Sequence, residues 1–137
     1  MIENITVTTT VLKPIDKVWE YFTQPQHVTM WNAASDDWHC PAATNDLKVG
    51  GTFHYTMAAK DGSMSFDFWG TYNDVQKEKL LEITLGDNRK MTVHFTALEK
   101  GTLLKESFEP ETQNSKELQQ AGWQAILDNF KKYAEGL

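Results

Sequence analysis

The sequence predicts an α+β protein in which a curved antiparallel sheet of six or seven strands wraps around one long C-terminal helix. The first observation is the alternation of apolar and polar residues through most of the chain from Thr52 to Phe108. The second is a helical apolar stripe in residues 122–137. The third is an amphipathic segment in residues 15–22, which predicts the first of two short helices after the first strand.

The N-terminal residues predict one strand followed by a helix. Residues 2–12 alternate β-branched apolar residues with threonines, a pattern typical of a strand. Pro14 suits the first turn of a helix, because the N–H that proline lacks would have no partner there. The apolar residues that follow have helical spacing and predict one buried stripe: Ile15, Val18, Trp19 and Phe22.

Pro25 ends or restarts this helix, and residues 27–31 predict a second short helical turn. Residues 32–51 contain Asp, Asn and Pro and end in Gly50-Gly51. They show no sustained period, so they predict an irregular segment.

The middle of the chain predicts a series of antiparallel strands, because the breaks between its alternating segments are short. Asp61-Gly62 predicts a two-residue hairpin. Further breaks fall at residues 77–78, 87–88 and 100–101. The residues expected to share the inner face are Phe53, Tyr55 and Met57, then Phe66, Phe68, Gly70 and Tyr72, then Leu81, Ile83 and Leu85, then Met91, Val93 and Phe95, and finally Leu104, Glu106 and Phe108.

The last helix is expected to begin at a capping box formed by Asn114 and Glu117. Its apolar face contains Trp123, Ile126, Leu127, Phe130 and Tyr133, and its opposite face contains Gln124, Asp128 and Lys131.

Length and charge limit the classes of function. The 137 residues are expected to form one domain, residues 1–137. The net charge of −6 argues against a nucleic-acid surface and against docking on anionic membranes. Cys40 is the single cysteine, and no leader or membrane-spanning pattern is seen, so a cytoplasmic protein is expected. Whether it forms a homodimer stays open.

With this order of elements, the chain resembles the SRPBCC superfamily, the helix-grip fold shared by START domains and the birch-pollen-allergen group. Within it, the chain is similar to the branch related to the C-terminal domain of the activator of the heat-shock 90 ATPase. The residues that carry the resemblance are 18–23 with Trp31-Asn32, then 37–41, 49–53 and 66–72, and finally Gly122-Trp123.

The resemblance implies the helix-grip fold and leaves several functions open, because the superfamily contains carriers, cyclases and stress proteins. A co-chaperone or stress-response interaction protein is one alternative. The eukaryotic co-chaperone has a separate N-terminal domain for which 137 residues leave no room, so a chaperone is not the partner we favour. A cyclase- or hydrolase-like enzyme that uses polar residues inside the cavity is another alternative.

The preferred interpretation is a binding protein for a hydrophobic or amphipathic small molecule, held between the sheet and the last helix. Aromatic walls with a few polar groups are typical of such sites. Polar tips such as Tyr55, Tyr72 or His94 would orient the ligand, and a larger residue at Gly70 would reach across the cavity. The candidate ligand-binding residues are Trp31, Trp38, Phe53, Tyr55, Phe66, Phe68, Met91, Phe108, Trp123, Leu127 and Phe130.

No catalytic residue, cofactor or metal is assigned. The cluster Asp36, Asp37, His39 and Cys40 contains metal-ligand residue types but lacks a second donor segment, so a structured loop is expected there. Three polar strand residues are out of phase with their apolar neighbours and are expected to face solvent: His54, Glu82 and His94. Glu106 shares phase with Leu104 and Phe108 and is expected to point inward, as a structural or an acid–base group.

Overall fold

The computed structural model describes residues 3–137, and in this range it contains one seven-stranded antiparallel sheet and three helices. The sheet has the order β1-β7-β6-β5-β4-β3-β2, which confirms the predicted α+β class. The strands are β1 (Ile5–Val11), β2 (Trp38–Asn45), β3 (Thr52–Ala59), β4 (Ser65–Gln76), β5 (Leu80–Leu85), β6 (Lys90–Leu98) and β7 (Gly101–Phe108). The helices are α1 (Ile15–Thr23), α2 (Pro25–Trp31) and α3 (Lys116–Glu135).

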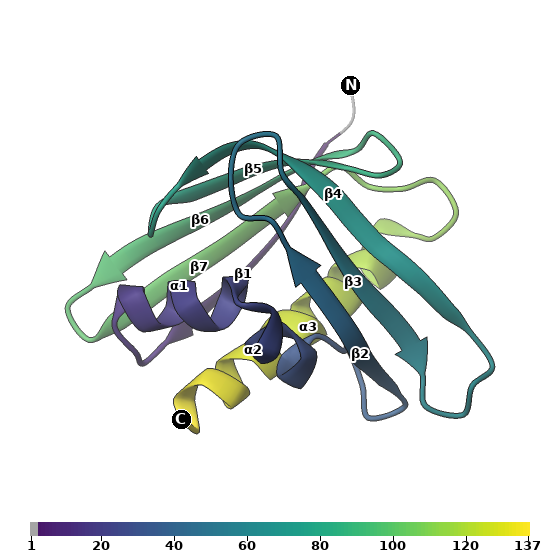
Figure 1. Ribbon diagram of the computed structural model, residues 1–137, viewed down its shortest axis with the longest axis horizontal. Helices are drawn as coiled ribbons and strands as arrows, with labels where there is room; N and C mark the ends of the chain where they lie inside the picture. Colours follow the sequence, from purple (N-terminus) through teal and green to yellow (C-terminus); the bar gives the residue numbers. More distant parts are fainter. Residues whose placement is uncertain (1–2) are drawn as a thin grey trace.

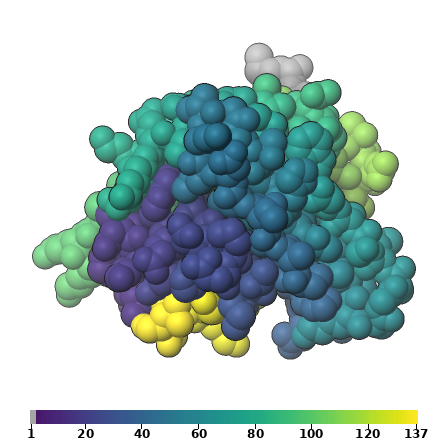
Figure 2. All heavy atoms as spheres, in the orientation of Figure 1, coloured from purple at the N-terminus to yellow at the C-terminus, as the bar shows by residue number. Residues whose placement is uncertain are grey.

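The sheet curves as a half-barrel, and α3 lies along its concave side (Figure 1). Helix α3 packs mainly against β1 and α2, while α1 contacts β6, β7 and both other helices. In the space-filling view, α1 and α2 lie against the C-terminal end of α3 (Figure 2). No helix of the described residues is long and apolar enough to cross a membrane.

The predicted inner phase of the strands is confirmed, because the in-phase side chains of β3, β5, β6 and β7 form the core. The predicted outward side chains of His54, Glu82 and His94 are exposed. The expected first strand over residues 2–12 is shorter, running from Ile5 to Val11, and its first predicted residue lies outside the described range.

Residues 38–45 correct the sequence analysis, which expected residues 32–51 to be irregular. They form β2, an edge strand paired with β3 and shifted in register between His39 and Ala42. Pro41 lies at this shift, where the missing N–H of proline is tolerated. Cys40 is the strand's one buried residue, so no alternation of apolar residues marks it in the sequence.

The β3–β4 connection is also longer than predicted. The strands are joined by residues 60–64, with the amide of Ala59 donating to the carbonyl of Met64. Gly62 adopts a φ of 80° in this turn, and the Asp61 side chain accepts a bond from the amide of Ser63. The Asp-Gly pair therefore marks the turn correctly but not its length.

Helix α3 begins one residue later than predicted. The N-cap is Ser115, whose side chain accepts a hydrogen bond from the amide of Leu118 at 3.1 Å. The side chain of Asn114, which lies outside the helix, instead donates through Nδ2 to the Glu111 carboxylate.

Two polar residues of α3 that were expected on its solvent face lie against the free edge of β1. The side chain of Gln124 donates to the carbonyl of Thr8 at 3.0 Å, and the ammonium group of Lys131 donates to the carbonyl of Thr10. These bonds pair backbone groups that an exposed edge strand would leave open to another chain. They also fix α3 lengthwise against β1.

Candidate ligand cavity

A cavity of about 260 Å³ lies between the concave face of the sheet, the two short helices and α3. Its wall is mostly apolar and aromatic. The lining residues are Phe22, Thr23, Trp31, Asn32, Phe53, Tyr55, Met57, Phe66, Phe68, Tyr72, Leu81, Ile83, Arg89, Met91, Val93, Glu106, Trp123 and Ile126.

Strands β3 and β4 provide a continuous aromatic wall because alternate residues of a strand point to the same face. The ring of Phe53 lies at the centre of this wall, with its centroid 4.8 Å from Tyr55, 5.7 Å from Phe68 and 5.6 Å from Tyr72. From the facing helix, Trp123 meets Phe68 edge-on at 5.8 Å. The cavity is therefore enclosed by rings from β3, β4 and α3.

Most lining side chains are buried, and those of Phe22, Phe68, Arg89, Trp123 and Ile126 are partly exposed. Three of these five come from β4 and α3, which indicates an opening between these two elements. Phe66 is 51% exposed, and its ring lies 6.1 Å from that of Trp38 at the start of β2. Phe66 and Trp38 together form the apolar rim of the opening.

A hydrogen-bonded chain ties the end of α1 to the floor of the cavity. The hydroxyl group of Tyr72 donates to Oδ1 of Asn45 at 2.7 Å, and Nδ2 of Asn45 donates to the carbonyl of Thr23 at 2.7 Å. Burial raises the pKa of Tyr72 to about 12. Burial, and then the nearby Tyr72, raise the pKa of Tyr55 as well, so both phenols are neutral at physiological pH.

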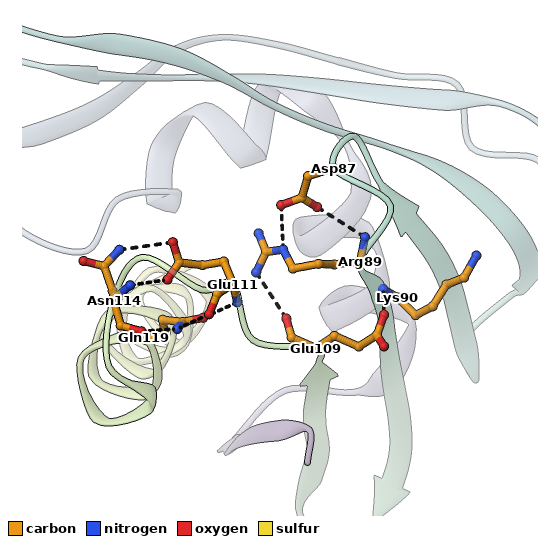
Figure 3. Close-up of polar contacts among 7 residues, drawn as sticks. All are labelled: Asp87, Arg89, Lys90, Glu109, Glu111, Asn114 and Gln119. Atoms are coloured by element: carbon orange, nitrogen blue, oxygen red, sulfur yellow. Dashed lines mark hydrogen bonds and ion pairs between the residues drawn. The ribbon is translucent and has the colours of Figure 1, made fainter. Parts of the chain in front are cut away.

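Arg89, in the β5–β6 turn, is the one basic side chain of the described residues that lines the cavity. Its Nε donates to the Asp87 carboxylate at 2.7 Å, and a terminal nitrogen donates to the carbonyl of Glu109 at 3.2 Å (Figure 3). Beside it, Gln119 of α3 bonds the main chain of Glu111 and Asn114. This network connects the β5–β6 turn and the β7–α3 loop next to the cavity.

Glu106 is the one acidic side chain of the described residues on the cavity wall. It is 7% exposed, on β7, and confirms the inward direction predicted from its phase. Burial raises its pKa from 4.5 to about 8, so the carboxyl group is largely protonated at neutral pH. Glu106 was not among the predicted ligand-binding residues, although its phase in the sequence predicted its direction.

The structure brings seven of the eleven predicted ligand-binding residues to the cavity wall, and their contact with a ligand stays a prediction. These seven are Trp31, Phe53, Tyr55, Phe66, Phe68, Met91 and Trp123. Phe108, Leu127 and Phe130 are instead fully buried in the core, and Trp38 lies beside the rim. His94, suggested as a polar tip, is on the outer face of β6 and cannot reach the cavity.

Gly70 does not border open space as the sequence analysis expected. A Cβ atom at this position would lie 2.8 Å from Cγ2 of Ile83 and 2.9 Å from the ring of Phe53. A larger residue there would displace the wall instead of filling the cavity.

Other polar clusters do not form a comparable site. Asp36, Asp37 and His39 are exposed, while Cys40 points to the opposite face of β2 from His39. Burial raises the pKa of the Cys40 thiol, which makes it a poor nucleophile. Among residues 3–137, no group of three or more His, Cys, Asp or Glu side chains is arranged to hold a metal ion.

The family model described as activator of Hsp90 ATPase homolog 1-like protein matches residues 13–135. The chain belongs to this family. This confirms the resemblance to the SRPBCC superfamily and to this branch of it. No functionally curated protein matches the chain.

Solved structures agree with the family assignment. An AHSA1-like protein from Aeromonas hydrophila is 42% identical, with a TM-score of 0.92, over 98% of this chain and 93% of its own. A protein from Cytophaga hutchinsonii is 56% identical, with a TM-score of 0.84, over 97% of this chain and 92% of its own. A protein from Chromobacterium violaceum is 20% identical, with a TM-score of 0.86, over 97% of this chain and 98% of its own, which shows the shared fold.

Proposed function

We propose that this AHSA1-like protein binds a hydrophobic or amphipathic small molecule in the cavity, and that it does so in the cytoplasm. The observation that supports the proposal is the cavity itself, with its aromatic walls and few polar groups. Its volume of about 260 Å³ lies just below the ~300–1,000 Å³ typical of small-molecule sites, so the ligand is expected to be compact.

Binding would come mainly from apolar area removed from water. A compact ligand that buries roughly 200 Å² of apolar surface gains about 5 kcal/mol, from which the cost of association is subtracted. Aromatic walls add edge-to-face contacts with a ring in the ligand. We therefore expect modest affinity for unspecialised apolar compounds, and higher affinity where a polar group of the ligand is matched.

The test is native mass spectrometry of freshly purified protein, followed by titration with an environment-sensitive apolar dye. The filling variant is Ile126→Trp, because Ile126 lines the cavity from α3. The matched control is Leu118→Trp on the same helix, where the side chain is 61% exposed and not on the wall. Dye affinity should fall in the first variant and not in the second. Equal dye binding in both variants and the parent would place the dye elsewhere and remove the support for the cavity.

The family's description favours a second candidate, an activator of the ATPase of an Hsp90-type chaperone with a role in stress response. Such an activity would use an outer surface of the protein. An ATPase assay with the chaperone from the same organism tests it, with the Ile126→Trp variant as a control. Stimulation that this variant leaves unchanged would separate the chaperone function from the cavity.

The enzyme alternative has less support. Acid–base catalysis generally needs a positioned proton donor or acceptor beside the reacting group. Glu106 is the one carboxyl or imidazole group of the described residues that lines the cavity. The other ionisable lining groups are the neutral phenols of Tyr55 and Tyr72 and the paired guanidinium group of Arg89.

A further inference from the structure

Glu106 is the lining side chain that simple core packing does not explain. It sits in the central part of β7, between its register partners Val7 on β1 and Val93 on β6. These valines are 1% and 0% exposed, so the carboxyl group has apolar neighbours on both sides along the sheet. A buried carboxyl group in such surroundings costs free energy unless something bonds it.

Nothing in the described part of the chain bonds it. Burial is the one cause of its raised pKa, with no hydrogen bond or charge contributing. Yet every fully enclosed side-chain nitrogen or oxygen of the described residues has a hydrogen-bond partner. The carboxyl oxygens of Glu106 must therefore open onto the cavity space, where a ligand can reach them.

Asn32 is a second buried polar side chain of the cavity wall, on the side formed by the helices. It follows α2, lines the same cavity and is 7% exposed. Its main-chain amide donates to the carbonyl of Val28, but its side-chain amide bonds no described residue. The cavity is thus lined by two buried polar side chains, Glu106 and Asn32, whose polar groups form no hydrogen bond with another described residue.

We propose that the ligand carries an uncharged oxygen, such as a carbonyl group, that accepts a hydrogen bond from the carboxylic acid of Glu106. This rests on the proposed function, because it assigns the chemistry of the ligand for that same cavity. The rest of the ligand is apolar and meets the aromatic wall of β3, β4 and α3. Asn32 is a second polar anchor at the other side of the cavity.

The charges around Glu106 favour a neutral ligand. The ionisable groups that line the cavity with it are Tyr55 on β3, Tyr72 on β4 and Arg89 in the β5–β6 turn. The described lining residues of α1, α2, β6 and α3 include no ionisable side chain, and β1 contributes none to the wall. The guanidinium group of Arg89 disfavours a cation in the same cavity, and an anion would lose its hydration against a wall that is mostly apolar.

The protonated acid is the form that donates, and it predominates below a pKa of about 8. Binding of an oxygen acceptor should therefore weaken as the pH rises through this value. Binding of a hydrocarbon of the same shape should change less, because it makes no bond to the carboxyl group.

The experiment compares 1-tetralone with tetralin, which share a bicyclic frame and differ in one carbonyl oxygen. Their affinities are measured by calorimetry or dye displacement at about pH 6 and about pH 10, on either side of the Glu106 pKa. The variants are Glu106→Gln, which keeps a neutral donor at every pH, and Glu106→Leu, which removes it. Circular dichroism confirms that each sample is folded.

The expected result is a ratio of tetralone to tetralin affinity that falls roughly threefold to tenfold between the two pH values in the parent protein. The ratio should stay high at both pH values in Glu106→Gln and low at both in Glu106→Leu. If the leucine variant fails to fold, the parent pH series with the glutamine variant decides the question.

Other results separate the two proposals. If both compounds bind with a ratio that neither pH nor Glu106 changes, the ligand-binding function stands and the role of Glu106 is wrong. If 2-aminotetralin binds better than both and loses its advantage in Glu106→Gln, the ligand is an amine and the neutral-oxygen class is wrong. If none of the three compounds binds, the proposed function itself fails.

Discussion

The indole ring of Trp123 stacks on the ring of Phe108, with centroids 3.7 Å apart and an interplanar angle of 18°. Phe108 is fully buried at the end of β7, and Trp123 is partly exposed on α3. This contact joins the N-terminal half of α3 to the sheet at the mouth of the cavity. It confirms the prediction that Trp123 faces the concave side.

Trp123→Ala should lower the free energy of unfolding by about 3 kcal/mol, because it removes a stacked pair and a large apolar contact. It should also enlarge the cavity, so that a bulkier dye binds. Chemical denaturation measures the first effect and a dye series the second. Leu118→Ala on the exposed side of the same helix is the control, and its stability should change by less than about 0.5 kcal/mol. A Trp123 variant as stable as this control would contradict the stacking of Trp123 on Phe108.

Glu106 makes the stability of the fold depend on pH. Its pKa is about 8 in the native state and about 4.5 in the unfolded chain, so between these values the native state holds a proton that the unfolded chain has released. Stability from this group is complete below about pH 4.5, falls as the pH rises and is lost by about pH 8. The full effect is of the order of 5 kcal/mol.

The variant Glu106→Gln should remove this dependence, because the amide does not ionise. The free energy of unfolding of the parent should therefore fall from pH 5 to pH 9 relative to that of the variant. Urea denaturation at a series of pH values measures it. Glu82→Gln, on the exposed face of β5, is the matched control and should leave the parent's pH profile in place. A parent profile that is flat across this window would mean that Glu106 ionises normally.

The sequence predicted the parts of the fold that are governed by hydrophobic phase. Apolar residues recur with period two in strands β3 to β7 and with helical spacing in α3, as expected for elements with one buried face. The same alternation predicted that Glu106 points inward. Strand β2 was missed because an edge strand with a bulge at Pro41 buries just one residue. The other edge strand, β1, was predicted because its residues alternate between buried and exposed, whereas those of β2 leave no such periodic signal in the sequence.

The candidate site was predictable in its aromatic wall but not in its polar groups. Aromatic residues in phase with the core had to lie near the space between sheet and helix. Arg89 and Asn32 come from a turn and a helix end, where no period assigns a direction. Phe53 borders the cavity, whereas Phe130 is fully buried in the core and does not line it. The sequence does not predict this difference, because it depends on the distance between α3 and each strand.

At the start of α3, Ser115 and Asn114 should differ in how much they contribute to the stability of the protein. Ser115→Ala should lower the free energy of unfolding by about 1 kcal/mol, because the amide of Leu118 loses its side-chain acceptor. Asn114→Ala should cost less, since its side chain makes an exposed contact with Glu111 at 3.2 Å. Thermal denaturation of the two variants measures the difference. The reverse order of stabilities would restore Asn114 as the N-cap.

Two glycines should respond oppositely to the same substitution. A Cβ atom at Gly122, inside α3, meets no atom within 4 Å, so Gly122→Ala should stabilise the protein by about 0.5–1 kcal/mol through the helix propensity of alanine. A Cβ atom at Gly70 meets Ile83 at 2.8 Å, Phe53 at 2.9 Å and the carbonyl of Thr84 at 3.0 Å. Gly70→Ala should therefore destabilise by about 1–3 kcal/mol, as overpacking does. Calorimetric melts of both variants provide the measurement. Since Phe53 is the centre of the aromatic wall, the Gly70 variant should also weaken dye binding, and an unaltered dye affinity would mean that the wall absorbs the added methyl group without moving.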